Sequence, residues 1–167
     1  MTSPNYAALK AAMATGGQYA GMTDAQAVAA CNAATVDIAV DVPTENVTKY
    51  LGVNGLLPTV RSWANTAPTP PATGLTAAQI QEAVVAAQTF GLMIGPPPLW
   101  GTLSMSDPTT NGQIKGMVDA LVTGGLLPQA NATAILAMSQ ATVSQASLWG
   151  WPGGIIENDL VAARAWT

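Results

Sequence analysis

The stretch Leu75-Thr76-Ala77-Ala78-Gln79 contains a helix start signal that decides how the surrounding chain folds. An N-cap threonine accepts a hydrogen bond from the amide three residues later, and a glutamine there reaches back to the threonine amide. Thr76 and Gln79 have this spacing, and Thr23 and Gln26 repeat it near the N-terminus. The two capping boxes therefore predict helices over residues 23–32 and 76–90.

Outward from these two helices, glycine and proline separate further short amphipathic segments. Within the helix that begins at Thr76, a stripe of Ile80, Val84, Ala87 and Leu92 recurs at helical spacing. Asp107 followed by Pro108 is typical of a helix N-terminus. The pattern predicts a mainly α fold, a bundle of short helices joined by Gly/Pro turns, with further helices over residues 6–14, 43–53, 107–123, 128–138, 142–149 and 157–166.

One four-residue pattern occurs twice, as Gly55-Leu56-Leu57-Pro58 and as Gly125-Leu126-Leu127-Pro128. Each copy follows an amphipathic helix, so each predicts a left-handed glycine C-cap, two leucines folded back on the helix, and a proline that opens the next segment. A duplicated helix-turn-helix is one explanation. Convergence of two helix corners on the same turn is favoured, because the surrounding residues do not align.

Residues 35–42 differ from the rest of the chain because β-branched residues alternate with polar or small ones. Val36, Ile38, Val40 and Val42 have the period of two that is typical of a strand. A lone strand in a helical domain needs a partner, and a neighbouring chain is one candidate. Two interpretations stay open: a short strand or extended arm, and an irregular connector.

The only internal boundary that the sequence suggests is the Pro/Thr-rich segment 65–74, an internal linker or an exposed loop. The length of 167 residues fits a single helical domain over 1–167. The longest near-apolar run, residues 83–100, is interrupted by polar residues and by Pro96, Pro97 and Pro98. It does not predict a membrane span.

The composition excludes several classes of protein. Charged residues make up only 8 % of the chain and apolar residues 49 %, the reverse of a disordered segment. A net charge of −4 argues against direct nucleic-acid binding, which needs a basic face. A surface with so few charges is prone to associate, which suits a subunit held among many copies.

Catalysis has little support in the sequence. The chain has no histidine, so Ser/His/Asp and Cys/His arrangements are excluded, and Cys31 is its only cysteine. A carboxylate hydrolase built on Glu82, Asp107 and Glu157 is the remaining enzymatic hypothesis, although these residues are isolated in sequence. Asp24, Asp37 and Asp41 lack the spacing of a metal loop. We therefore expect a protein that is not an enzyme and that uses no metal or cofactor.

The tryptophans carry the clearest indication of a binding surface. Trp149 and Trp151 flank a glycine, Trp100 follows the triple proline, and Trp63 precedes segment 65–74. Tryptophan beside glycine and proline in loops is typical of interfaces, whereas core filling is the equally weighted alternative. The candidate interface residues are Trp63, Trp100, Trp149, Trp151, Pro96, Pro97, Pro98, Val36, Ile38 and Val40.

Both ends of the chain resemble small proteins encoded among the virion genes of tailed bacteriophages. The resemblance is carried by Leu9-Lys10-Ala11, by residues 19–27 (YAGMTDAQA), by residues 143–150 (VSQASLWG) and by residues 159–164 (DLVAAR). The chain departs from the family pattern at Gln145, where arginine is common, and at residues 151–154, which look like an insertion. The middle of the chain is not matched.

The resemblance implies a component of a phage particle, and no catalytic residues are carried over from it. The expected function is that of a minor virion structural protein of the capsid, head–tail connector or tail, made in the host cytoplasm. It would contact other virion proteins in multiple copies, without nucleic acid or membrane. The alternative is a helical module that binds an apolar ligand or a glycan through Trp100, Trp149 and Trp151.

Overall fold

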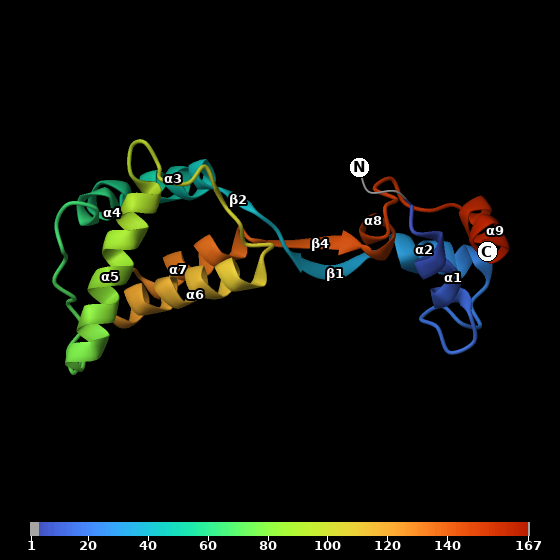
Figure 1. Cartoon of the computed structure of the whole chain (residues 1–167), viewed down its shortest axis with the longest axis horizontal. Coiled ribbons are helices and arrows are strands. Elements are labelled where there is room, and N and C mark those ends of the chain that lie inside the picture. The colour runs from blue at the N-terminus through green and yellow to red at the C-terminus, as the bar shows by residue number, and fades with distance from the viewer. Residues whose placement is uncertain (1–3, 167) are drawn as a thin grey trace. The chain divides into compact units, whose positions relative to one another are not determined.

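The computed structural model describes residues 4–166 of the chain. These residues form nine helices and two two-stranded sheets, which confirms the mainly α fold. The sequence predicts one helical domain, whereas the structure groups the chain into two compact units. Unit 1 takes the described residues up to Ile38 and from Thr142 onward, and unit 2 comprises Ala39–Ala141 (Figure 1). Unit 2 is therefore inserted between the two chain segments that build unit 1.

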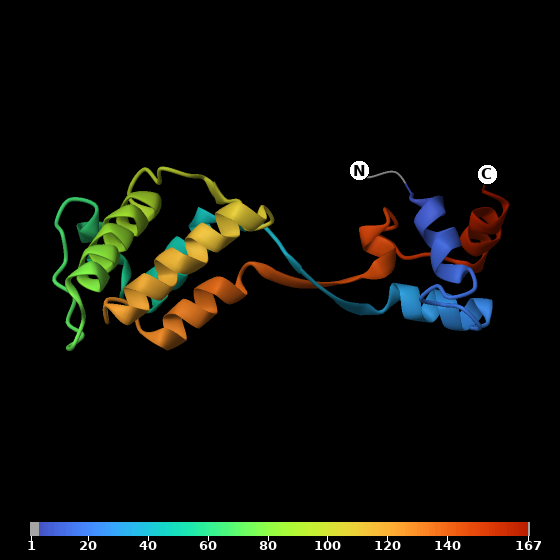
Figure 2. The ribbon, with the colours of Figure 1, turned by 60° about the horizontal axis from the view of Figure 1, so that its bottom comes forward.

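Unit 1 is a small helical cluster in which α1 packs against α9 (Figure 2). Its buried side chains include Leu9, Cys31, Trp151 and Leu160. Tyr6 adds an aromatic contact at the edge of this core, because its ring meets Trp151 edge-on with centroids 5.2 Å apart. The helices of unit 1 are α1 (Tyr6–Met13), α2 (Asp24–Asn32), α8 (Gln145–Leu148) and α9 (Glu157–Ala165).

Two polar contacts join helix α2 to the C-terminal segment of unit 1. Asp24 binds Arg164 of α9 through both carboxylate oxygens, and this guanidinium holds the pKa of the carboxyl below its ordinary value. At the other end of α2, the Asn32 side chain donates from Nδ2 to the Ile155 backbone carbonyl (2.9 Å). Its Oδ1 accepts from the Ile155 backbone amide (2.7 Å). Gly154 has a φ of +86°, so the turn beside Asn32 favours glycine.

The Asn32 contact gives a testable prediction for the stability of unit 1. We expect Asn32→Ala to lower the free energy of unfolding by about 2 kcal/mol, because two part-buried backbone groups lose their partner. The measurement is the reaction of a thiol reagent with Cys31, which is 0 % exposed, and the rate should rise about tenfold to thirtyfold. Asn158→Ala on α9 is the control, because Asn158 is exposed and its side chain forms no hydrogen bond with a described residue. Equal rates of Cys31 labelling in the two variants would contradict the prediction.

Strand β1 (Ala34–Ala39) confirms the strand interpretation of residues 35–42, and its partner lies in the same chain. It pairs with β4 (Gln140–Ser144), and the Thr142 hydroxyl donates to the Asp37 carboxylate at 2.7 Å. The sequence predicts helix from residue 142 onward, so this part of the prediction is wrong. The chain leaves unit 1 along β1 and returns along β4.

Unit 2 is built on helices whose N-termini the sequence predicts. Both bonds of the capping box at Thr76 and Gln79 are present, as they are at Thr23 and Gln26 in unit 1. Asp107 caps its helix by accepting from the Thr110 amide at 2.7 Å. The elements of unit 2 are β2 (Val42–Pro43), α3 (Thr44–Val53), α4 (Leu57–Trp63), α5 (Ala77–Ile94), β3 (Thr102–Leu103), α6 (Pro108–Thr123) and α7 (Gln129–Ala137).

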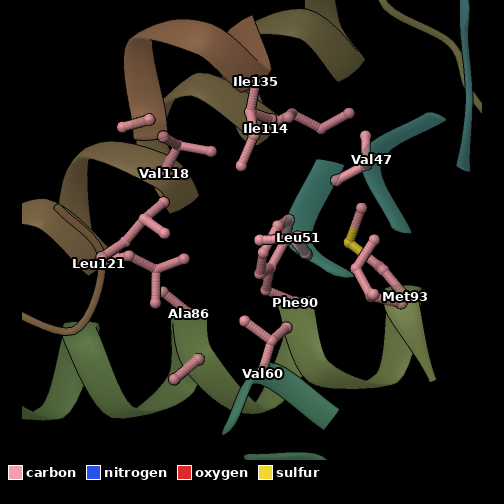
Figure 3. Close-up of a cluster of buried hydrophobic side chains, with 14 of the residues drawn as sticks. Val47, Leu51, Val60, Ala86, Phe90, Met93, Ile114, Val118, Leu121 and Ile135 are labelled. Atoms are coloured by element: carbon pink, nitrogen blue, oxygen red, sulfur yellow. The ribbon is translucent and has the colours of Figure 1, made fainter. Parts of the chain in front are cut away.

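The core of unit 2 lies where α3, α4 and α6 meet α5, and α7 contributes to it by packing on α6 (Figure 3). Phe90 and Leu121 are completely buried in it, and Figure 2 shows α7 lying beside α6. The predicted stripe is only partly the buried face of α5: Ala87 is buried, but Ile80 and Leu92 are exposed by 42 % and 50 %. The buried residues of α5 are Ala83, Ala86, Ala87, Phe90, Gly91, Met93 and Ile94.

The two Gly-Leu-Leu-Pro turns fold as predicted. Gly55 and Gly125 have φ values of +71° and +72°, and the amides of Leu56 and Leu126 donate back to Leu51 and Leu121, in both cases at 2.9 Å. Segment 65–74 lies inside unit 2 and connects α4 to α5 as an irregular, largely exposed loop. None of the helices in residues 4–166 is long and apolar enough to cross a membrane.

Candidate functional site

The candidate site is a groove on unit 2 between α5 and α6, which we call the α5–α6 groove. It has a volume of about 270 Å³, and its walls are mainly apolar. Small residues on both helices keep it open, because Ala86, Gly116 and Ala120 bring little side-chain bulk to its floor. It is lined by Glu82, Val85, Ala86, Thr89 and Met93 of α5, by Thr110, Gln113, Ile114, Gly116, Met117 and Ala120 of α6, and by Trp100.

Trp100 is held at the groove by the backbone around it. The Thr44 hydroxyl at the start of α3 donates to the Trp100 carbonyl at 2.6 Å, and the Thr44 amide donates to Gly101 at 3.1 Å. Strand β3 follows directly and pairs antiparallel with β2, with Pro43 opposite Thr102. The indole is 43 % exposed, so it offers a positioned aromatic surface beside the groove.

One end of the groove is acidic. A second hollow of about 260 Å³ shares Glu82, Gly116 and Ala120 with the first and adds Gln79, Asp119 and Thr123. Glu82 of α5 and Asp119 of α6 both line this acidic end. Neither carboxylate forms a salt bridge or a side-chain hydrogen bond with any residue between 4 and 166.

Two of the four predicted interface tryptophans are core residues, which corrects that part of the hypothesis. Trp63 is 4 % exposed in the core of unit 2, and Trp151 is 8 % exposed in the core of unit 1. Because the chain contains a single phenylalanine, these tryptophans supply the bulky side chains that fill the two small cores. Trp149 is half-buried against the core of unit 1, with its ring centroid 6.3 Å from that of Tyr19.

The other predicted interface residues lie at separate places. Pro96, Pro97 and Pro98 are exposed and line a hollow with Arg61 and the first turn of α3. Val36 and Ile38 are half-buried on β1. Val40 is also half-buried, just after β1, and its amide donates to the Ser139 carbonyl at 2.8 Å. An interface role for these residues stays a prediction.

The carboxylates of the hydrolase hypothesis lie on three different helices. Glu82 lies in the groove of unit 2, Asp107 caps α6, and Glu157 is in the first turn of α9 in unit 1. Hydrogen bonds from Thr110 lower the pKa of Asp107. Within residues 4–166, no three His, Cys, Asp or Glu side chains lie close enough together to hold a metal ion.

The aspartates weighed as metal ligands make other contacts. Asp24 binds Arg164, and Asp37 accepts from Thr142. Asp41 accepts from the Ser106 hydroxyl and amide at 2.6 and 2.9 Å, and these bonds lower its pKa. Each of the three carboxylates thus joins two segments that are distant in the sequence.

Cys31 and Tyr19 are buried together in unit 1. Burial, together with the neighbouring thiol, raises the pKa of Tyr19 to about 12, and burial also raises the pKa of the Cys31 thiol. Both side chains are therefore neutral at physiological pH. Cys31 is completely buried, so its thiol is inaccessible.

The sequence identifies Trp100 but misses the rest of the groove. Glu82 and Asp119 are 37 positions apart in the sequence, and only the packing of α5 on α6 brings them to one end. The only sequence signal for the groove was the small residues on α5 and α6. They allow the two helices to approach closely, but they do not by themselves indicate a groove. Comparison with protein-family models, curated proteins and solved structures finds no match to this chain.

Proposed function

We propose that this protein is a non-enzymatic structural component of a tailed-bacteriophage particle, a minor accessory subunit of the capsid, head–tail connector or tail. It acts through protein–protein contacts. The observation that carries the proposal is the α5–α6 groove, an open apolar surface with a positioned tryptophan on its edge. Concave apolar sites with an aromatic anchor are where binding energy concentrates in protein interfaces.

The exposed apolar surface around the groove supports the same function. Val85 and Leu92 of α5 are each 50 % exposed, and Leu99 is 65 % exposed. The Leu99 amide donates to the Leu92 carbonyl at 3.3 Å, so the segment before Trp100 lies against the end of α5. With only 8 % charged residues in the chain, such a surface favours association with other subunits.

The resemblance of both chain ends to virion-region proteins of tailed phages supports an association within a phage particle. Those ends build unit 1, and the groove is in unit 2. Unit 1 also exposes apolar side chains, among them Ile156, Val161 and Trp166, which are 50–60 % exposed. Both units thus carry surface suited to contact with other virion proteins.

The experiment that tests this proposal is quantitative mass spectrometry of purified phage particles. We expect the protein in stoichiometric amounts, in hundreds of copies if it decorates the capsid and in about a dozen if it belongs to a connector ring. Gradient fractions without particles are the control. Absence from particles that otherwise contain their full set of proteins would overturn the proposal.

A second candidate function is the binding of a small apolar ligand in the same groove. Its apolar lining favours this, although its volume of about 270 Å³ is just below the usual range for ligand sites, roughly 300–1,000 Å³. Of the three tryptophans in this hypothesis, Trp100 lines the groove, whereas Trp151 is 8 % exposed and offers little surface to a ligand. Fluorescence titration of wild type and Trp100→Ala with long-chain alcohols tests it.

A further inference from the structure

The α5–α6 groove changes character along its length. Its larger part has apolar walls with Trp100, Val85 and Met93, and it continues into the acidic end through Glu82, Gly116 and Ala120, which line both. An occupant that fills the whole groove therefore meets an apolar surface first and two carboxylates next. This combination restricts the chemistry of the partner.

No lysine or arginine among the described residues forms a salt bridge with Glu82 or Asp119 at the acidic end. Lys49 pairs with Glu45 at 2.8 Å, and Arg61 lines the separate hollow beside the triple proline. Lys115 precedes Asp119 by one turn of α6 but forms no salt bridge with it within residues 4–166. Two carboxylates at one end of an apolar groove attract a positively charged group from outside.

We propose that the α5–α6 groove binds a segment of a partner virion protein that places bulky apolar side chains against Trp100 and a lysine or arginine between Glu82 and Asp119. This inference rests on the proposed function and specifies the partner's chemistry. A polypeptide segment fits better than a small ligand because the apolar surface continues beyond the groove over Leu92 and Leu99. Charge at the acidic end then selects the partner and its register.

Gly116 offers a way to block the groove without damaging the fold. A Cβ added at Gly116 meets nothing within 4 Å, and this exposed residue of α6 lines the groove. Gly116→Leu therefore fills the groove, and helix propensity predicts that it does not lower the melting temperature. Gly112→Leu is the matched control, because Gly112 is equally open and in the same helix but does not line the groove.

The binding test uses the full chain and three fluorescein-labelled leucine-rich peptides that differ only in ending with two lysines, two serines or two glutamates. We expect the lysine peptide to bind about tenfold more tightly than the glutamate peptide at low salt, with the serine peptide between them. In the double variant Glu82→Gln, Asp119→Asn this order should collapse to within about twofold, while the serine peptide keeps its affinity. Gly116→Leu should weaken all three peptides at least about tenfold, and Gly112→Leu none of them.

Several results would overturn this inference. These are equal binding of the three peptides, an unchanged order in the double variant, or full binding by a folded Gly116→Leu protein. Binding of octylamine as tightly as the lysine peptide would assign the groove to a small cationic amphiphile instead. Glu45→Gln is the charge control, because it removes an exposed carboxylate of unit 2 that lies outside the groove.

Particle incorporation separates failure of this inference from failure of the proposed function. Phage lacking the gene for this protein is complemented with wild type, Gly112→Leu or Gly116→Leu. We expect wild type and Gly112→Leu in particles and Gly116→Leu reduced at least about tenfold. Equal incorporation of all three overturns the groove as the docking site and leaves the virion function standing, whereas absence of all three overturns the virion function.

Discussion

Trp63→Ala is expected to lower the free energy of unfolding by about 3–5 kcal/mol. The side chain is 4 % exposed in the core of unit 2, and replacing a buried tryptophan by alanine removes apolar contacts and leaves a cavity that the helices fill only in part. This loss is a large fraction of the total stability of a domain of this size. Urea unfolding followed by far-ultraviolet circular dichroism measures it as a shift of the midpoint.

Trp100→Ala is the matched control for this prediction, because it deletes the same side chain from the surface of the same unit. With the indole 43 % exposed, we expect a loss of about 1 kcal/mol or less. The peptide affinity of the groove should show the opposite order, with Trp100→Ala the more harmful change in protein that remains folded. Equal destabilisation by the two variants would contradict the assignment of Trp63 to the core and of Trp100 to the groove.

Features decided by a few neighbouring residues could be predicted from the sequence. The capping boxes at Thr23 and Thr76 and the Asp107 cap depend on bonds that span three residues, so the sequence contains both partners. The glycine turns at Gly55 and Gly125 are local in the same way. Most helix positions followed from these signals with small errors at the ends, but α4 was not predicted, and the predicted helix over 142–149 is reduced to the four residues of α8.

Features decided by distant partners could not be predicted. Strand β4 is a short polar segment, Gln-Ala-Thr-Val-Ser, and it becomes a strand because β1 offers a backbone edge about 100 residues earlier in the chain. The buried face of α5 was only partly predicted, for a related reason. Ala83, Ala86 and Ala87 face inward because small side chains allow the other helices to approach, which leaves the bulkier Ile80 and Leu92 outside.

The same distinction explains the candidate site. Trp100 stood out by its neighbours in the sequence, but so did Trp151, and only the tertiary packing separates the exposed residue from the buried one. Glu82 and Asp119 are ordinary surface carboxylates of two helices until those helices pack together. The acidic end of the groove is a property of the pair of helices, so neither helix alone predicts it.

Gly91→Ala is expected to destabilise unit 2 by about 2–3 kcal/mol, although alanine is the better helix former. A Cβ at Gly91 would lie 2.6 Å from the Ala64 backbone nitrogen and 2.8 Å from the Val60 carbonyl oxygen. Both atoms belong to the backbone of α4 and its C-cap, so relief requires moving α4 away from α5, where Phe90 and Trp63 are packed. The cost of overpacking exceeds the gain of about 1 kcal/mol in helix propensity.

Gly112→Ala on α6 makes the same chemical change where a Cβ meets nothing within 4 Å, and we expect it to stabilise the protein by up to about 1 kcal/mol. The two variants should therefore shift the urea midpoint in opposite directions. A stabilising effect of both would mean that α4 does not approach α5 at Gly91, and the packing of α4 in unit 2 would then be wrong. Trp63 lies on α4, so the same result would also remove the reason for the large destabilisation expected of Trp63→Ala. Trp63→Ala tests the packing of α4 on α5 from α4, and Gly91→Ala tests it from α5.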